Sequence, residues 1–123
     1  MEQRIVKTIE LENGHILVIS DLSRKISENA CVVVMKVNME IKIVKELFSD
    51  IPLSDFKFQD ILGVLGDKAV YEYKVERNFI MDHEKDGVFD NIVETYIKNT
   101  GQYVSKPGFP GKFVLKEYKN RIK

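Results

Sequence analysis

A short acidic segment, residues 82–90, carries the most distinctive spacing of side chains that can bind a metal ion. Acidic residues occupy its first, third, fifth and ninth positions, and Gly87 occupies the sixth. Carboxylate oxygens at alternate positions can surround a hard cation such as Ca²⁺, and a glycine permits the sharp turn that such a loop needs. The segment therefore indicates a candidate metal site. Its ligands would be Asp82, Glu84, Asp86 and Asp90.

The spacing resembles the calcium loop of EF-hand proteins, but it departs from that pattern. The twelfth position is Val93 instead of a bidentate glutamate, and Glu94 follows one residue late. The other candidate ligand of the segment is His83, and the second histidine of the chain, His15, lies too far away in sequence for zinc-ligand spacing. The alternative interpretation, which we favour, is an acidic helix start that the helix dipole stabilises.

A second candidate site is the sequence Asp21-Leu22-Ser23-Arg24, which is expected to follow a strand. Its Asp-x-Ser pattern is similar to the second motif of PilZ domains, and the resemblance implies a site for cyclic diguanylate. The PilZ pattern continues to a glycine and is preceded by an arginine pair, and this chain has neither at the matching positions. The alternative is a local turn in which Asp21 and Ser23 bind nearby backbone groups and Arg24 is solvated.

The third candidate is basic. Residues 106–123 contain six basic residues and one acidic residue. If the segment is a helix, four lysines line one side of it and form a site for an acidic protein surface or an anionic membrane surface. The alternative is soluble surface that is solvated or packs near the acidic residues 82–94. The four lysines are Lys112, Lys116, Lys119 and Lys123.

Composition limits the partners and the compartment. The 19 basic and 19 acidic residues balance, which argues against nucleic acid as a partner. Cys31 is the only cysteine, so no internal disulfide is expected. No apolar run reaches the roughly 20 residues that span a bilayer, and the N-terminus does not resemble a signal peptide. We expect a cytoplasmic protein of bacterial type, with no cofactor.

The strands that position these candidates begin with a hairpin. Asn13-Gly14 separates two strand-like segments, residues 4–11 and 15–20, and this dipeptide predicts a two-residue type I′ turn. The stretch from Leu11-Glu12-Asn13-Gly14 to Arg24 also resembles small bacterial proteins of unknown function. That resemblance covers at most a quarter of the chain and implies no catalytic residue. A loop is expected over residues 21–29.

The clearest pattern in the chain is an alternation of apolar side chains from Cys31 to Ile43. A period of two predicts one long strand with a buried face and a wet face, and its length predicts a bulge or bend. The strand is expected to offer an exposed edge to a second copy or to a partner strand. Residues 70–77 alternate in the same way and predict a later strand. The alternating apolar residues are Cys31, Val33, Met35, Val37, Met39, Ile41 and Ile43.

Helical spacing marks three further segments. The first has apolar residues from Phe58 to Leu65, with Pro52 as a break, Ser54 as N-cap, Asp55 in the first turn and Gly66 at its end. The second has an apolar stripe from Val88 to Ile97 and is expected to end at Gly101. A turn-rich loop follows at 105–111. Residues 112–123 are expected to be helical, although 113–118 would also fit a strand.

The order of elements predicts one α+β domain over residues 1–123. An antiparallel sheet, formed by the hairpin, the long third strand and the later strand, is covered on one face by two or three helices. We expect a non-enzymatic binding or protein-interaction domain that pairs with itself or with an acidic protein surface. The alternatives are a metal- or calcium-responsive protein and a PilZ-like nucleotide sensor. No nucleophile or general base stands out for an enzyme.

Overall fold

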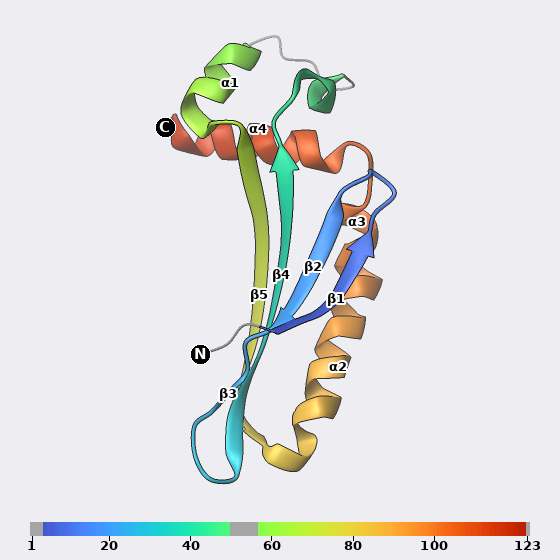
Figure 1. The fold of residues 1–123 in the computed structure, drawn as a ribbon, viewed down its shortest axis with the longest axis vertical. Coiled ribbons are helices and arrows are strands. Elements are labelled where there is room, and N and C mark those ends of the chain that lie inside the picture. The colour runs from blue at the N-terminus through green and yellow to red at the C-terminus, as the bar shows by residue number, and fades with distance from the viewer. Residues whose placement is uncertain (1–3, 50–56, 123) are drawn as a thin grey trace.

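The computed structural model of this chain describes residues 4–49 and 57–122. Its described strands form one antiparallel sheet of five strands whose inner face packs against helices, so the predicted α+β fold is confirmed (Figure 1). The strands are β1 (Arg4–Glu10), β2 (Ile16–Asp21), β3 (Arg24–Lys25), β4 (Ala30–Lys42) and β5 (Lys68–Met81). The helical segments are η1 (Lys45–Phe48), α1 (Phe58–Leu65), η2 (Asp82–Glu84), α2 (Lys85–Tyr96), η3 (Ile97–Gly101), α3 (Gln102–Val104) and α4 (Phe109–Arg121).

β1 and β2 form the predicted hairpin, but its turn differs from the predicted type. Gly14 N–H donates to the carbonyl of Leu11 at 2.9 Å, and Leu11 N–H donates to the carbonyl of His15 at 2.8 Å. Within this turn only Gly14 has a positive φ, of 84°, so the connection is a three-residue turn with a glycine bulge. The Asn13 side chain instead donates to the carbonyls of Val104 and Lys106, at 2.9 and 3.0 Å.

β4 is the predicted long strand, and it lies in the middle of the sheet. It pairs with β2 and β3 along one side and with β5 along the other. The prediction that this strand offers a free edge is therefore wrong, because alternation of apolar residues reports the faces of a strand and not its neighbours. The expected loop at 21–29 also contains β3. Among the described strands, β1 and β5 are the long free edges of the sheet, and the two-residue β3 also pairs on one side only.

A bulge does interrupt the pairing of the long strand with β5, but its extra residue belongs to β5 and not to the strand for which it was predicted. The register shifts between Cys31 and Val33 of β4, so that two residues of β5, Asn78 and Phe79, oppose Val32. Phe79 has a φ of 56°, a left-handed backbone conformation that residues other than glycine, asparagine and aspartate seldom adopt. Beyond this bulge β5 continues to Met81, so the strand is longer than the predicted residues 70–77.

The helix predicted at 88–97 does not end at Gly101. α2 continues through the π-helical turn η3 into α3 and reaches Val104. A glycine ends a helix when it adopts a left-handed conformation with a positive φ. Gly101 instead has a helical φ of −56°. The physical reason for the wrong prediction is therefore that this glycine is used inside a helix.

The other helices agree better with the sequence. Gly66, with a φ of 85°, follows α1 as predicted, and its N–H donates to the carbonyl of Leu62 at 2.8 Å. The predicted features at Pro52, Ser54 and Asp55 lie outside the described residues. The C-terminal segment is a helix, as expected, but α4 begins at Phe109 inside the predicted loop. Pro110 is compatible with that start because the first turn of a helix needs no proline N–H.

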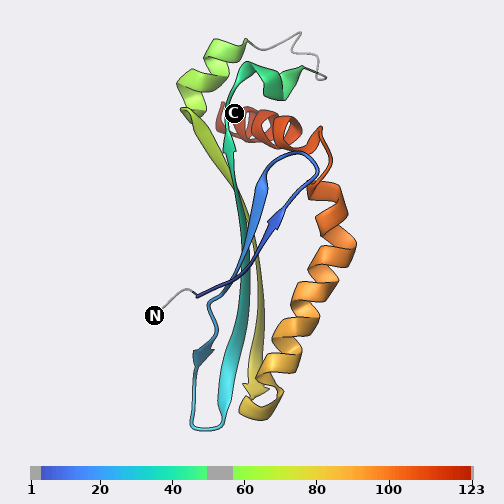
Figure 2. The same ribbon diagram turned by 45° about the vertical axis from the view of Figure 1, so that its right-hand side comes forward.

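The molecule is elongated, with β4, β5 and α2 running along its length and α4 crossing one end (Figures 1 and 2). The core lies between the inner face of the sheet and the helices. It contains the inward side chains of β2 and β4 together with residues of α2, α3 and α4. Among residues 4–49 and 57–122, no helix is long and apolar enough to cross a membrane.

Candidate functional site

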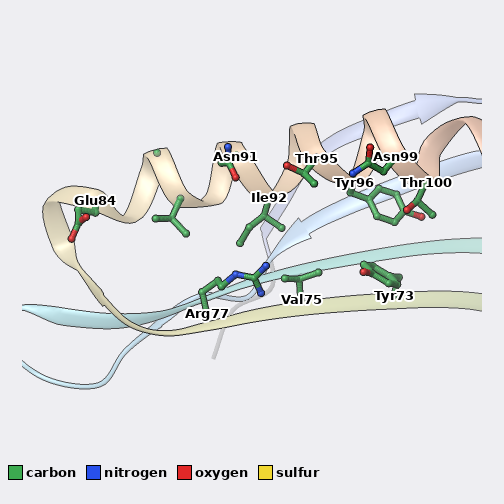
Figure 3. Close-up of a pocket in the computed structure, with 12 residues that line it drawn as sticks. Tyr73, Val75, Arg77, Glu84, Asn91, Ile92, Thr95, Tyr96, Asn99 and Thr100 are labelled. Atoms are coloured by element: carbon green, nitrogen blue, oxygen red, sulfur yellow. The ribbon is translucent and has the colours of Figure 1, made fainter.

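A groove of about 600 Å³ lies between the edge strand β5 and helix α2. Figure 3 shows side chains of β5 on one side and a row of α2 and η3 side chains on the other. Ligand sites in proteins commonly have volumes of about 300–1,000 Å³ and combine apolar walls with a few polar groups. The groove therefore has the size and the lining of a binding site.

α2 has two different sides because of its helical period. Phe89, Ile92 and Tyr96 are buried in the core. Asn91, Thr95 and Asn99 follow one another at steps of four residues, are exposed, and line the groove. Residues at this spacing lie on the same side of a helix. The helix thus presents a row of uncharged amide and hydroxyl groups, which can donate and accept hydrogen bonds.

The strand side of the groove consists of Tyr73, Val75 and Arg77. Each of them opposes a fully buried residue of β4, so all three project from the inner face of the sheet. The Tyr73 side chain is nevertheless 43% exposed. α2 lies over the centre of the sheet, and the edge strand is left partly uncovered, which opens the groove along β5.

Two tyrosines join the strand to the helix next to the groove. The hydroxyl oxygens of Tyr71 and Tyr96 are 2.8 Å apart and form a hydrogen bond. Burial raises the pKa of the Tyr96 phenol far above its usual range, and the hydrogen bond with Tyr71 raises it further. Burial also raises the pKa of Tyr71. The ring of Tyr73 lies against that of Tyr96, with centroids 5.1 Å apart. This end of the groove is therefore aromatic and uncharged.

The lining offers two charged side chains among neutral hydrogen-bonding groups. Its two charged side chains are Arg77 and Glu84, and its other polar groups are amides, hydroxyls and the Tyr phenols. The Arg77 guanidinium donates to the carbonyl of Glu76 at 3.1 Å, and it pairs with no carboxylate among the described residues. A cationic fork at one end of the groove and an aromatic wall at the other (Figure 3) can hold a partner's carboxylate, carbonyl or aromatic ring.

The candidate metal residues lie on a helix and not in a loop. Asp82 and Glu84 belong to η2, and Asp86 and Asp90 belong to α2. The Asp82 carboxylate pairs with the Lys25 ammonium group at 2.8 Å. In the described part of the chain, no three His, Cys, Asp or Glu side chains gather as a metal site would require. Metal binding by this segment stays a prediction, and Glu84 alone also lines the groove.

Asp21, Ser23 and Arg24 form a structural turn between β2 and β3. The Asp21 carboxylate accepts from the Ser23 N–H at 2.8 Å and from the Arg4 guanidinium at 3.1 Å. The Ser23 hydroxyl accepts from the N–H of Val34 at 2.9 Å, which ties the turn to β4. Arg24 is exposed. These contacts are those of the local-turn interpretation, and the nucleotide site remains a prediction.

The basic residues lie at the opposite end of the molecule from the acidic segment. Lys112, Lys116 and Lys119 are exposed on α4, and Lys123 lies outside the described residues. Figures 1 and 2 place α4 at one end and the start of α2 at the other. α4 therefore does not pack on residues 82–90, and its role in binding a partner stays a prediction.

The residues of the groove were missed by sequence reasoning. Asn91, Thr95 and Asn99 do recur at steps of four, but this pattern is also typical of any solvated helix side. Tyr73 and Arg77 belong to an alternating strand and look like ordinary strand residues. Only the position of α2 relative to the sheet edge distinguishes them, and no local pattern encodes it.

Comparison of this chain with models of protein families, with curated proteins and with solved structures finds no match.

Proposed function

We propose that this chain is a protein-interaction domain that binds an extended strand of a partner at the free edge of β5. The added strand continues the sheet, and its inward side chains enter the groove beside α2. Strand addition of this kind obtains affinity from main-chain hydrogen bonds and specificity from pockets for alternate side chains.

The observation that carries the proposal is the coincidence of a long free edge with a groove on its inner face. β5 has 14 residues and pairs with β4 alone among the described strands. Natural proteins usually protect such edges with proline, bulges, charged side chains or a covering helix, and of these β5 has one bulge and charges of both signs. β5 contains no proline, its bulge lies near one end, and α2 leaves its inner side chains accessible.

Peptide display tests this function with a matched pair of variants. Extended peptides are selected from a random library against the immobilised domain, synthesised, and titrated with the wild type, Asn91→Trp and Asp90→Trp. Both residues are exposed neighbours on α2, but only Asn91 lines the groove. We expect Asn91→Trp to weaken binding by about tenfold or more, equal to about 1.4 kcal/mol. Asp90→Trp should bind as the wild type does.

Amide shifts in NMR spectra locate the bound peptide independently. The largest changes are expected along β5, with small changes along the other free edge, β1. Enrichment of no peptide by a domain that stays monomeric, equal binding by both tryptophan variants, or shifts confined to β1 would each contradict the proposed function.

A further inference from the structure

The charges along β5 indicate which partner strand fits its edge. We infer that β5 pairs with β5 of a second copy of this chain, antiparallel, about a two-fold axis at Val75. This inference rests on the proposed function, because it takes the free edge of β5 as the binding edge and names its occupant.

The outer face of β5 carries charges of alternating sign. Glu72, Lys74 and Glu76 are successive residues on that face, with side chains 53%, 48% and 46% exposed. The ion pair between Lys74 and Glu76, at 3.6 Å, is exposed and stabilises a single copy little. The pattern matters more between two paired strands, where opposite charges that face each other stabilise the pairing and like charges destabilise it.

Two-fold symmetry leaves few possible registers. In an antiparallel pair of identical strands, one residue must lie opposite its own copy at the two-fold axis. Only then do opposed side chains lie on the same face of the sheet. With the axis at Val75, Lys74 of each copy opposes Glu76 of the other, which forms a square of four alternating charges. With the axis at Lys74, the two lysines oppose each other and Glu72 opposes Glu76, so the like charges repel.

An axis at Tyr73 is the remaining competitor. It also forms two opposite-charge pairs, because Glu72 of each copy opposes Lys74 of the other, but it leaves Glu76 opposite the apolar Val70. On the inner face it also sets Arg77 opposite Ala69. The Val75 register is therefore the one in which Lys74 and Glu76 face opposite charges and Arg77 faces an aromatic ring instead of Ala69.

In the Val75 register the second copy completes the groove. Tyr73 of one copy opposes Arg77 of the other on the inner face, where both residues line the groove. A guanidinium over a tyrosine ring is attractive by about 0.5–2 kcal/mol, and Arg77 has no carboxylate partner among residues 4–49 and 57–122. The two grooves then meet at the axis, each with a wall from the other copy. The bulge at Asn78 and Phe79 limits regular pairing to residues 73–77.

A charge swap tests the register by light scattering coupled to gel filtration and by sedimentation velocity. The wild type is expected to be a dimer whose dissociation constant rises with salt. Lys74→Glu and Glu76→Lys should each raise that constant by about tenfold or more, because each brings like charges face to face. The double variant with both changes should restore it. Lys7→Glu, an exposed change on the other free edge, should leave the dimer intact.

An engineered thiol at the axis provides a second measurement. Opposed Cα atoms in antiparallel strands are about 4.5–5.5 Å apart, which suits a disulfide. Val75→Cys should therefore form a covalent dimer under mild oxidation. Tyr73→Cys should link far less, and the wild type should not link because Cys31 is buried.

The outcomes separate this inference from the proposed function. A wild type that stays monomeric at high concentration overturns the dimer, while peptides that still bind the groove would keep the proposed function. Failure of the double variant to restore the dimer, or preferential linking by Tyr73→Cys, overturns the Val75 register. A monomer that also binds no peptide overturns both the dimer and the function.

Discussion

β4 and β5 have 13 and 14 residues and pair with each other along most of their length, yet their surroundings are opposite. β4 has strands on both sides, and its inward side chains are fully buried. β5 has one paired side, and its inward residues Tyr73 and Arg77 remain exposed. Both strands show the same alternation in sequence. The comparison teaches that alternation identifies a strand, while its place in the sheet decides whether it builds the core or meets a partner.

The largest expected difference between the two strands is the loss in free energy of unfolding when a valine is shortened to alanine. Val37→Ala in β4 removes buried methyl groups and should lower the free energy of unfolding by about 2 kcal/mol or more. Val75→Ala in β5 removes them from a partly exposed position and should cost less than about 1 kcal/mol. Urea denaturation monitored by circular dichroism measures both. Equal costs would contradict the division between a core strand and an edge strand.

The sequence was informative about local structure and much less about the site. The hairpin at Asn13-Gly14, the long strand and the helix after Phe58 follow from patterns within a few residues. Gly101 was misread because its φ, and not its identity, decides whether a helix ends there. The groove depends on how far α2 covers the edge of β5. The extent of this coverage is set by packing between residues remote in sequence, so a local sequence pattern cannot predict it.

A smaller effect tests the paired side of β4. Ser23→Ala removes the hydroxyl that accepts from Val34 N–H, a part-buried bond of 2.9 Å. The orphaned N–H should lower the free energy of unfolding by about 1–2 kcal/mol. Arg24→Ala, at an exposed neighbour, should stay within about 0.5 kcal/mol of the wild type. If Arg24→Ala were the more costly change, the turn would have a role other than anchoring β4.

The smallest expected effect concerns the bulge of β5 and is a gain. Phe79 has a φ of 56°, and its side chain is 79% exposed, so it adds conformational strain and little packing. Asparagine tolerates this conformation better, and Phe79→Asn should raise the free energy of unfolding by about 0.5–1 kcal/mol. Met81→Asn changes an exposed residue of ordinary φ, −67°, and should bring no gain. A loss of stability in Phe79→Asn would show that the exposed ring contributes packing.

The hydrogen bond between Tyr71 and Tyr96 has a consequence for how the molecule responds to alkali. Burial raises the pKa of both phenols above their value in an unfolded chain, about 10, so neither ionises readily while α2 rests on β5. As the pH rises past that value, unfolded chains lose the phenolic protons and the folded state becomes less stable. The chain has five tyrosines and no tryptophan. Its ultraviolet absorbance during an alkaline titration therefore includes the ionisation of these two phenols, which should accompany the separation of the helix from the sheet.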